Sequence, residues 1–255
     1  MSRSASSLVR DLHRRRGREQ RGLTLAEGVR LVEEALTTRL RIQLALVSPA
    51  LEASARGRAL KTDLAAAGAA PIEVSDRELE QLAATEHPQG VLLVIEPLRW
   101  TLSQVSPASR RPVLILDRVQ DPGNVGTIIR TAHALGAAGV VALPGTAELQ
   151  NPKTLRASMG ALFRIPCVPV EEAAALGWCR EQGLRLLITE AGAPLPAAAD
   201  RAAPLALVFG NEGEGVRDGV AGQAAGRVGV PLQAGAESLN VAIAAGILLH
   251  EVTRE

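Results

Sequence analysis

The stretch VLILDRVQDPGNVGTIIR, residues 113–130, decides the fold of this protein. It opens with an unbroken apolar run, Val113–Leu116, as expected for a β-strand that is covered on both faces. A polar turn follows, in which Pro122-Gly123 favours a bend. Asn124 is the expected N-cap of a helix over about residues 124–136. A strand that runs through such a turn into a helix is typical of α/β proteins with a parallel sheet.

The same alternation continues to the end of the chain. We expect strands at 139–143, 164–169, 184–189, 204–209 and 227–231, and helices at 151–160, 170–182 and 238–252, the last with Ser238 as N-cap. Strands separated by helices in this way predict a doubly wound, mainly parallel sheet. In such a sheet, ligands bind at the carboxyl ends of the strands.

A second, smaller α/β unit precedes this one. We expect helices at 25–36, 51–68 and 76–84, with Ser75 as N-cap of the last, and strands at 42–47, 72–74 and 90–95. Residues 97–111 lack periodicity and contain Pro97, Pro107 and a pair of arginines, so they are the expected linker. The predicted domains are therefore 1–96 and 112–255.

Composition excludes several classes of protein. The chain is 47% hydrophobic but only 2% aromatic, so stacking of bases on aromatic rings can contribute little. Its net charge of +1 does not by itself indicate nucleic acid. Residues 1–30, however, carry eight arginines against three acids. Within this arm we select Arg14, Arg15, Arg16 and Arg21 as candidate RNA-binding residues. A solvated helix face is the alternative interpretation.

Cysteine and histidine usage favours a reducing compartment and no metal. Cys167 and Cys179 are far apart, and the four histidines show no metal-ligand spacing. No apolar run reaches the roughly 20 residues of a membrane span. We expect a cytoplasmic protein; the Arg- and Ser-rich start leaves a mitochondrial-type presequence as a second interpretation.

Three polar motifs follow predicted strands of the C-terminal domain. In the first (residues 116–130), Gly126 and Arg130 lie on one helical face, which leaves room for a guest group beside Arg130. The second (205–216) runs from an apolar strand into Gly210-Asn211-Glu212-Gly213-Glu214-Gly215, where backbone can approach a ligand closely. The third (230–243) contains Gly235 and the sequence Ser238-Leu239-Asn240. Each motif, taken singly, also fits an ordinary turn.

Together the motifs resemble the SpoU (TrmH-like) branch of the SPOUT methyltransferases. The pattern N-x-G-x-x-x-R matches residues 124–130, and G-x-E-G-x-G matches 210–215. The third pattern, I-P-x-x-G-x-x-x-S-L-N-V, is similar to 230–241, with Val for Ile and one residue fewer before Ser238. Residues 151–164 are similar to the connecting stretch of the family.

The N-terminal part is similar, more loosely, to the ribosomal-protein-like domain that binds RNA substrates in this family. The matching pieces are Ala26-Glu27-Gly28 and His87-Pro88-Gln89-Gly90-Val91. This domain favours 23S ribosomal RNA over tRNA as the substrate.

The resemblance implies a C-terminal trefoil knot, a homodimer, and S-adenosylmethionine as the donor of a methyl group to a ribose 2′-hydroxyl. It places the cofactor near Gly210, Val230, Leu232, Gly235 and Leu239. It assigns the chemistry to Arg130, supported by Asn124, Glu212, Ser238 and Asn240. Because a guanidinium stays protonated in proteins, we expect Arg130 to stabilise developing negative charge rather than to act as a base.

Two other functions compete with this one. A ribosomal-protein-like domain joined to an inactive methyltransferase domain would be an RNA-binding or ribosome-assembly module. An unrelated nucleotide enzyme is the other alternative, but the chain has neither a G-x-G-x-x-G loop nor a Walker A loop at the first motif.

Overall fold

A computed structural model describes residues 3–254. Internal contacts divide the chain into two compact units. Unit 1 comprises the residues up to Leu98 together with Gln150–Phe163, and unit 2 comprises Arg99–Leu149 and the residues from Arg164 onward. The predicted domains have a single boundary, at the linker 97–111, and assign residues 150–163 to the C-terminal domain. Those boundaries stay a prediction.

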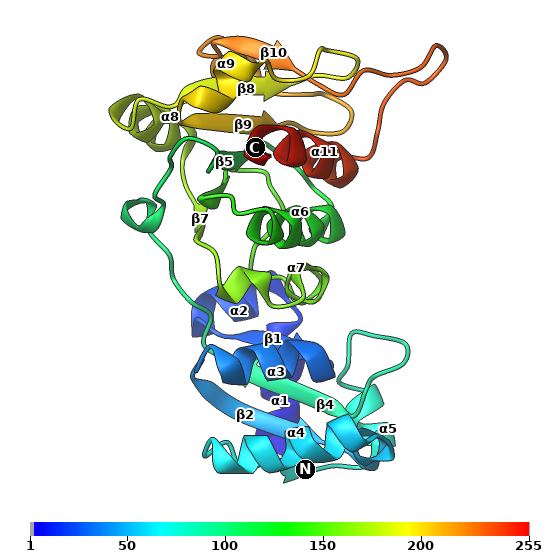
Figure 1. Ribbon diagram of the computed structural model, residues 1–255. Coiled ribbons are helices and arrows are strands. Elements are labelled where there is room, and N and C mark those ends of the chain that lie inside the picture. The colour runs from blue at the N-terminus through cyan, green and yellow to red at the C-terminus, as the bar shows by residue number, and fades with distance from the viewer. Residues whose placement is uncertain (1–2, 255) are drawn as a thin grey trace. The chain divides into compact units, whose positions relative to one another are not determined.

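Unit 1 is a mixed four-stranded sheet with helices (Figure 1). Its elements are α1 (Arg3–Leu12), α2 (Arg15–Arg21), β1 (Thr24–Glu27), α3 (Val29–Thr37), β2 (Ile42–Val47), η1 (Pro49–Ala53), α4 (Ala55–Ala66), β3 (Ile72–Glu73), α5 (Asp76–Glu80), β4 (Val91–Ile95), α7 (Pro152–Ser158) and η3 (Ala161–Phe163). The strand order is β1-β4-β2-β3, in which only β2 and β3 are parallel. Its core joins α1 to the sheet through Val9, Leu12, Leu25 and Leu46.

Two helices predicted in unit 1 are present but begin later than expected. Leu25 belongs to strand β1, which pairs antiparallel with β4, and the helix begins only at Val29. Gly28, with φ of 98°, separates the two elements because few other residues adopt this backbone conformation. The helix expected over 51–68 is broken at Ser54, whose hydroxyl accepts a hydrogen bond from the Gly57 N–H and caps α4. Ser75 is confirmed as the N-cap of α5, which ends at Glu80.

Unit 2 is a six-stranded parallel sheet with helices, as predicted. Its elements are η2 (Leu102–Gln104), β5 (Val113–Leu116), α6 (Pro122–Ala134), β6 (Gly139–Ala142), β7 (Cys167–Pro169), α8 (Glu172–Glu181), β8 (Arg185–Thr189), α9 (Ala198–Ala202), β9 (Leu205–Phe209), α10 (Asp218–Ala221), β10 (Gly226–Val228) and α11 (Val241–Thr253). The strand order is β10-β8-β9-β5-β6-β7, and every neighbouring pair is parallel. Figure 1 shows α11 alongside α6, which it contacts.

Burial in unit 2 explains the apolar runs of the sequence. All four residues of β5 are buried, because helices and loops cover both faces of the sheet. Trp178 and Cys179 of α8 pack on one face in a core that also contains Val105. Both tryptophans of the chain, Trp100 and Trp178, lie in or against this core, so tryptophan fluorescence reports on unit 2.

Two N-cap predictions in unit 2 are wrong. Asp121, not Asn124, caps α6: its carboxylate accepts from the Asn124 N–H at 2.9 Å, and the helix begins at Pro122. Asn240, not Ser238, caps α11, because its side-chain oxygen accepts from the N–H groups of Ala242 and Ile243. As a result, the whole side-chain amide of Asn124 and the amide nitrogen of Asn240 are available for hydrogen bonds to other segments.

Candidate active site

Three segments of unit 2 meet at the carboxyl ends of the parallel strands. The first motif follows β5, the second follows β9, and the third follows β10. Because β5 and β9 are neighbours in the sheet, the first two motifs leave it side by side. This edge is where ligands bind in sheets of this kind.

A chain of hydrogen bonds joins the three motifs. The Asn240 amide N–H donates to the side-chain oxygen of Asn124 at 3.0 Å. The Asn124 amide N–H in turn donates to the Glu212 carboxylate at 3.0 Å. The cap on α11 occupies the Asn240 oxygen, so its amide nitrogen is directed to Asn124. The backbone around α11 therefore orients the whole chain of three side chains, which we call the amide network.

The second motif is a tight loop held by Asn211. Its backbone forms two hydrogen bonds with Gly215, and its side-chain oxygen accepts from the N–H groups of Gly213 and Glu214. Its amide N–H donates to the carbonyl of Arg118 at 3.0 Å. A side chain at Gly210 is impossible here, because its Cβ would lie 2.3 Å from the carbonyl carbon of Gly215.

A buried ion pair fixes the end of the same loop. Asp117 is fully buried and accepts from the Arg217 backbone N–H at 2.8 Å and from its guanidinium at 2.6 Å. Arg217 also donates to Glu172 and to the carbonyl of Pro144. Burial alone would lower the pKa of Arg217, but hydrogen bonds and Coulomb attraction from Asp117 and Glu172 raise it above its usual value. The pair ties the second motif to β5.

We expect Asp117→Ala to lower the free energy of unfolding of unit 2 by about 3 kcal/mol, because it leaves the Arg217 charge without its main partner. Urea unfolding followed by tryptophan fluorescence measures this loss. Glu181→Ala, at an exposed end of α8, is the control and should change the free energy by less than about 0.5 kcal/mol. Equal stability of the two variants would contradict the assignment.

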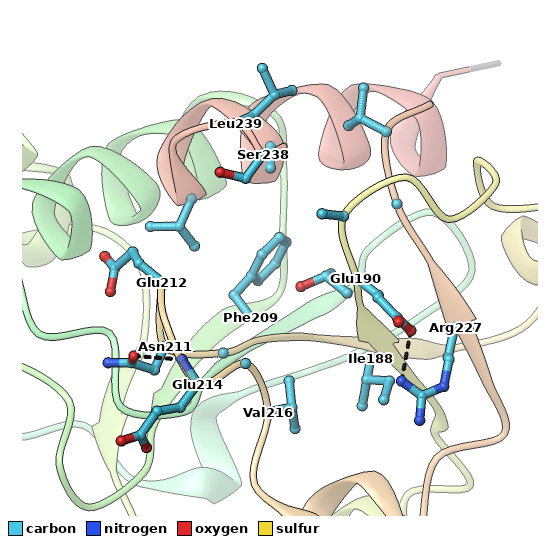
Figure 2. Close-up of a pocket in the computed structure, with 18 of the residues that line it drawn as sticks. Ile188, Glu190, Phe209, Asn211, Glu212, Glu214, Val216, Arg227, Ser238 and Leu239 are labelled. Carbon is cyan, nitrogen blue, oxygen red and sulfur yellow. Dashed lines mark hydrogen bonds and ion pairs between the residues drawn. The ribbon is translucent and has the colours of Figure 1, made fainter. Parts of the chain in front are cut away.

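Glu212 and Asn240 of the amide network line a pocket of about 600 Å³. Figure 2 shows residues of its lining, among them Glu212, Phe209 and Leu239. Seven of the predicted site residues line it: Gly210, Glu212, Val230, Leu232, Ser238, Leu239 and Asn240. Phe209 and Ile188 add apolar walls. Glu190, at the end of β8, also lines the pocket and forms an ion pair of 2.6 Å with Arg227. Apolar walls with a few polar groups are typical of a small-molecule site.

The remaining predicted residues lie outside this lining. Asn124 does not line the pocket, but it is hydrogen-bonded to Glu212 and Asn240, which do. Gly235, with φ of 91°, is in the exposed part of the third motif. Arg130 is exposed on α6, six residues after Asn124, and no hydrogen bond or ion pair to it is found within residues 3–254. The structure therefore assembles the pocket and the network but leaves Arg130 apart from both.

The arginines of the N-terminal arm are arranged on α1, α2 and the turn between them. Arg14, Arg15, Arg16 and Arg21 are all exposed. Arg15 pairs with Glu19, and Arg21 pairs with Asp11. Arg18 is buried and donates to the carbonyls of Leu12 and His13, so it connects the two helices rather than facing solvent.

Sequence reasoning did not select Asp117, Asn211, Arg217 or Glu190. Asp117 offered one signal, since a carboxylate directly after four buried residues needs a buried partner. Its partner lies 100 residues later, and nothing local in the sequence identifies it.

The described residues show neither a metal-binding cluster nor a membrane-spanning helix. Within residues 3–254, no group of three or more His, Cys, Asp or Glu side chains is placed to hold a metal ion. No helix there is long and apolar enough to cross a membrane. Cys167 and Cys179 are free and buried, and burial raises the pKa of both thiols, that of Cys179 to about 11.

A parallel sheet with a small-molecule pocket at its carboxyl edge, joined to a separate α/β unit, defines a two-unit α/β protein with a candidate enzyme site. Residues 111–250 match the SpoU rRNA methylase family, and residues 8–93 match the MRM3-like substrate binding domain. The chain belongs to the SpoU rRNA methylase family.

Several curated relatives align along most of the chain. The 23S rRNA (guanosine(2553)-2′-O)-methyltransferase RlmP of Bacillus subtilis is 35% identical and covers 94% of this chain and 92% of its own length. The 23S rRNA (guanosine-2′-O-)-methyltransferase RlmB of Ralstonia nicotianae is 33% identical, covering 87% of this chain and 93% of its own length.

Solved structures extend the similarity to both units. The SpoU methyltransferase AviRb of Streptomyces viridochromogenes, in complex with AdoMet, has a TM-score of 0.88 at 27% identity and covers 100% of this chain and 98% of its own. The AdoMet-bound rRNA methyltransferase of Sinorhizobium meliloti has a TM-score of 0.85 at 30% identity, covering 99% and 95%. The resemblance found in the sequence is confirmed.

Proposed function

We propose that this protein transfers the methyl group of S-adenosylmethionine to a ribose 2′-hydroxyl of ribosomal RNA. The amide network is the observation that carries the proposal. It joins Asn124, Glu212 and Asn240, one residue from each family motif, at the mouth of a pocket large enough for a nucleoside-sized cofactor. Relatives that act on 23S rRNA and neighbours that bind AdoMet support the same reaction.

The pocket residues fit S-adenosylmethionine by their chemistry. Phe209, Val230 and Leu232 offer an apolar surface to an adenine ring, and the loop around Gly210 offers backbone groups to its edge. The cofactor carries a sulfonium and an ammonium group, and the carboxylates of Glu190 and Glu212 line the same pocket. When bound, the sulfonium supplies the activated methyl group. The chain itself binds and orients both reactants.

Arg130 is proposed to act on the RNA rather than on the cofactor. It lies outside the pocket lining and carries a permanent charge on an exposed helical face. As the ribose oxygen accepts the methyl group its proton passes to solvent, and a guanidinium beside it stabilises the negative charge that develops on that oxygen. Glu212, Asn124, Ser238 and Asn240 would position the nucleotide from the side of the cofactor.

A homodimer through α11 and a trefoil knot at the third motif belong to the same proposal. Ile243 and Ile247 lie four residues apart on α11 and are 56% and 36% exposed, and Leu239, just before the helix, is 39% exposed. Large apolar side chains exposed in a row are typical of an interface. Sedimentation should therefore give twice the mass of the chain, and a strictly monomeric active species would contradict the dimer.

We assign 23S rRNA, in the cytoplasm, as the substrate in preference to tRNA. Unit 1 contains the segment that matches a substrate-binding domain, and the curated relatives described above are named for 23S rRNA. The exposed arginines Arg14, Arg15, Arg16 and Arg21 are its proposed phosphate contacts.

Calorimetry and methyl transfer test the proposal in two steps. We expect S-adenosylmethionine to bind the isolated protein, and label from its methyl group to appear in 2′-O-methylnucleosides after digestion of a 23S rRNA transcript. Binding of RNA without binding of the cofactor would indicate a non-catalytic RNA-binding module instead. Transfer to tRNA alone would keep the reaction and overturn the substrate.

A further inference from the structure

A hollow of about 480 Å³ on unit 2, away from the proposed cofactor pocket, carries a cluster of basic side chains. We call it the basic groove and define it by Arg110, Arg111, His133 and Arg164. Its other lining residues are Leu135, Gly136, Ala137, Ala138, Ile165, Pro166 and Thr253. No acidic residue within the described part of the chain lines it.

The two adjacent arginines of the groove sit on a turn whose backbone is fixed. Ala108 and Arg111 exchange two backbone hydrogen bonds, of 3.3 and 3.0 Å. The Ser109 hydroxyl donates to the carbonyl of Arg201 at 3.1 Å. Arg110 adopts φ of 61°, a left-handed conformation that only the surrounding contacts make acceptable for a non-glycine residue. The turn thus holds both arginines at the edge of the hollow.

The positive charge of Arg110 and Arg111 in the groove is not balanced by neighbouring negative groups in the part of the chain that the structure describes. The C-terminal end of α6 lies there, and a helix end carries only about half of a negative charge. Arg110 and Arg111 bring two adjacent positive charges, and within residues 3–254 neither of them has an ion pair with an acid. The positive charges of Arg110 and Arg111 repel each other, and an anion between them would relieve that repulsion.

The same helix links the groove to Arg130. His133 follows Arg130 by three residues on α6, and both are exposed, so they are neighbours on the helix surface. The rise along the helix between them is about 4.5 Å. Because His133 lines the groove, the groove begins about one helical turn from Arg130.

We propose that the basic groove binds phosphodiester groups of the substrate RNA strand and positions the target ribose at Arg130. This inference rests on the proposed function, which it deepens by naming where the strand passes over unit 2. Phosphate contacts of this kind fix the register of a nucleic acid without reading its sequence.

The salt dependence of RNA binding tests the groove. The probe is a fluorescein-labelled single-stranded RNA of mixed sequence, about 20 nucleotides long, titrated at salt concentrations from about 50 to 200 mM. Arg110→Ala/Arg111→Ala is expected to reduce the slope of log affinity against log salt by about 1.4, at about 0.7 for each lost phosphate contact. Over this range the wild type then loses roughly sevenfold more affinity than the variant.

Two matched variants decide what the change means. Arg99→Ala/Arg180→Ala removes the same charge from exposed positions of unit 2 outside the groove, and it should keep the wild-type slope. Arg110→Lys/Arg111→Lys keeps the charge and should also keep the slope. Thermal melting shows that each variant folds, and Arg110→Gln/Arg111→Gln replaces the alanine variant if that one does not.

Three results would overturn the proposal that the groove binds RNA. These are a wild-type slope in the alanine variant, an equal reduction of the slope in the Arg99/Arg180 control, and no RNA binding by the wild type. Failure of the proposed function has a different signature: the slope changes as expected, but no methyl group reaches RNA. S-adenosylmethionine affinity should be the same in all of these variants, because none of the residues lines the cofactor pocket.

Discussion

Arg130→Ala is expected to lower the rate of methyl transfer by at least about 10²-fold, the usual effect of removing a group that stabilises an oxyanion. Affinity for S-adenosylmethionine should stay within about twofold, because Arg130 does not line the pocket. Single-turnover transfer to a 23S rRNA transcript measures the rate, and calorimetry measures the affinity.

Two control variants test whether the rate depends on the positive charge at this position. Arg130→Lys keeps a cation and should retain part of the rate, although an ammonium lacks the planar fork of a guanidinium. Arg99→Ala removes an exposed arginine elsewhere in unit 2 and should leave the rate unchanged. Near-wild-type turnover of Arg130→Ala would remove Arg130 from the reaction.

Gly210→Ala is expected to abolish measurable binding of S-adenosylmethionine. The new Cβ would lie 2.3 Å from the Gly215 carbonyl carbon and 2.4 Å from the Val216 nitrogen. These are backbone atoms, so the loop itself must move, and Asn211, which holds it, must lose hydrogen bonds. Calorimetry with the cofactor and tryptophan fluorescence of unit 2 together measure binding and folding.

The control for Gly210→Ala is a glycine replaced where there is space. At Gly177 in α8 the nearest atom to a new Cβ is 3.9 Å away. Gly177→Ala should keep cofactor affinity and stabilise the helix by about 0.5–1 kcal/mol. Wild-type cofactor affinity in Gly210→Ala would mean that the second motif does not form the pocket as described.

Much of unit 2 could be predicted from its sequence because its strands are buried on both faces. Val113–Leu116 shows this best: a short apolar run with no polar face has few places to lie except inside a parallel sheet. The helix assigned to 25–36 shows the opposite case. Leu25 has helical spacing to Val29, but antiparallel pairing with β4 and the backbone of Gly28 decide its structure, and pairing across the chain has no local signal.

The candidate site could be predicted only in part. The motifs indicated which residues matter, and the structure brings Asn124, Glu212 and Asn240 together. How they meet was not predictable, because it depends on which residue caps each helix. With Asp121 as the cap of α6, the Asn124 amide is available for the network. The ion pair of Asp117 and Arg217 joins two segments that only the folded sheet places side by side.

The most direct test of the account is a map of 2′-O-methylation in 23S rRNA from cells with and without the gene. We expect one ribose methylation to disappear in the deletion strain, to return with the wild-type gene, and not to return with Arg130→Ala. An unchanged map of ribose methylation, or the loss of a base methylation instead, would contradict it.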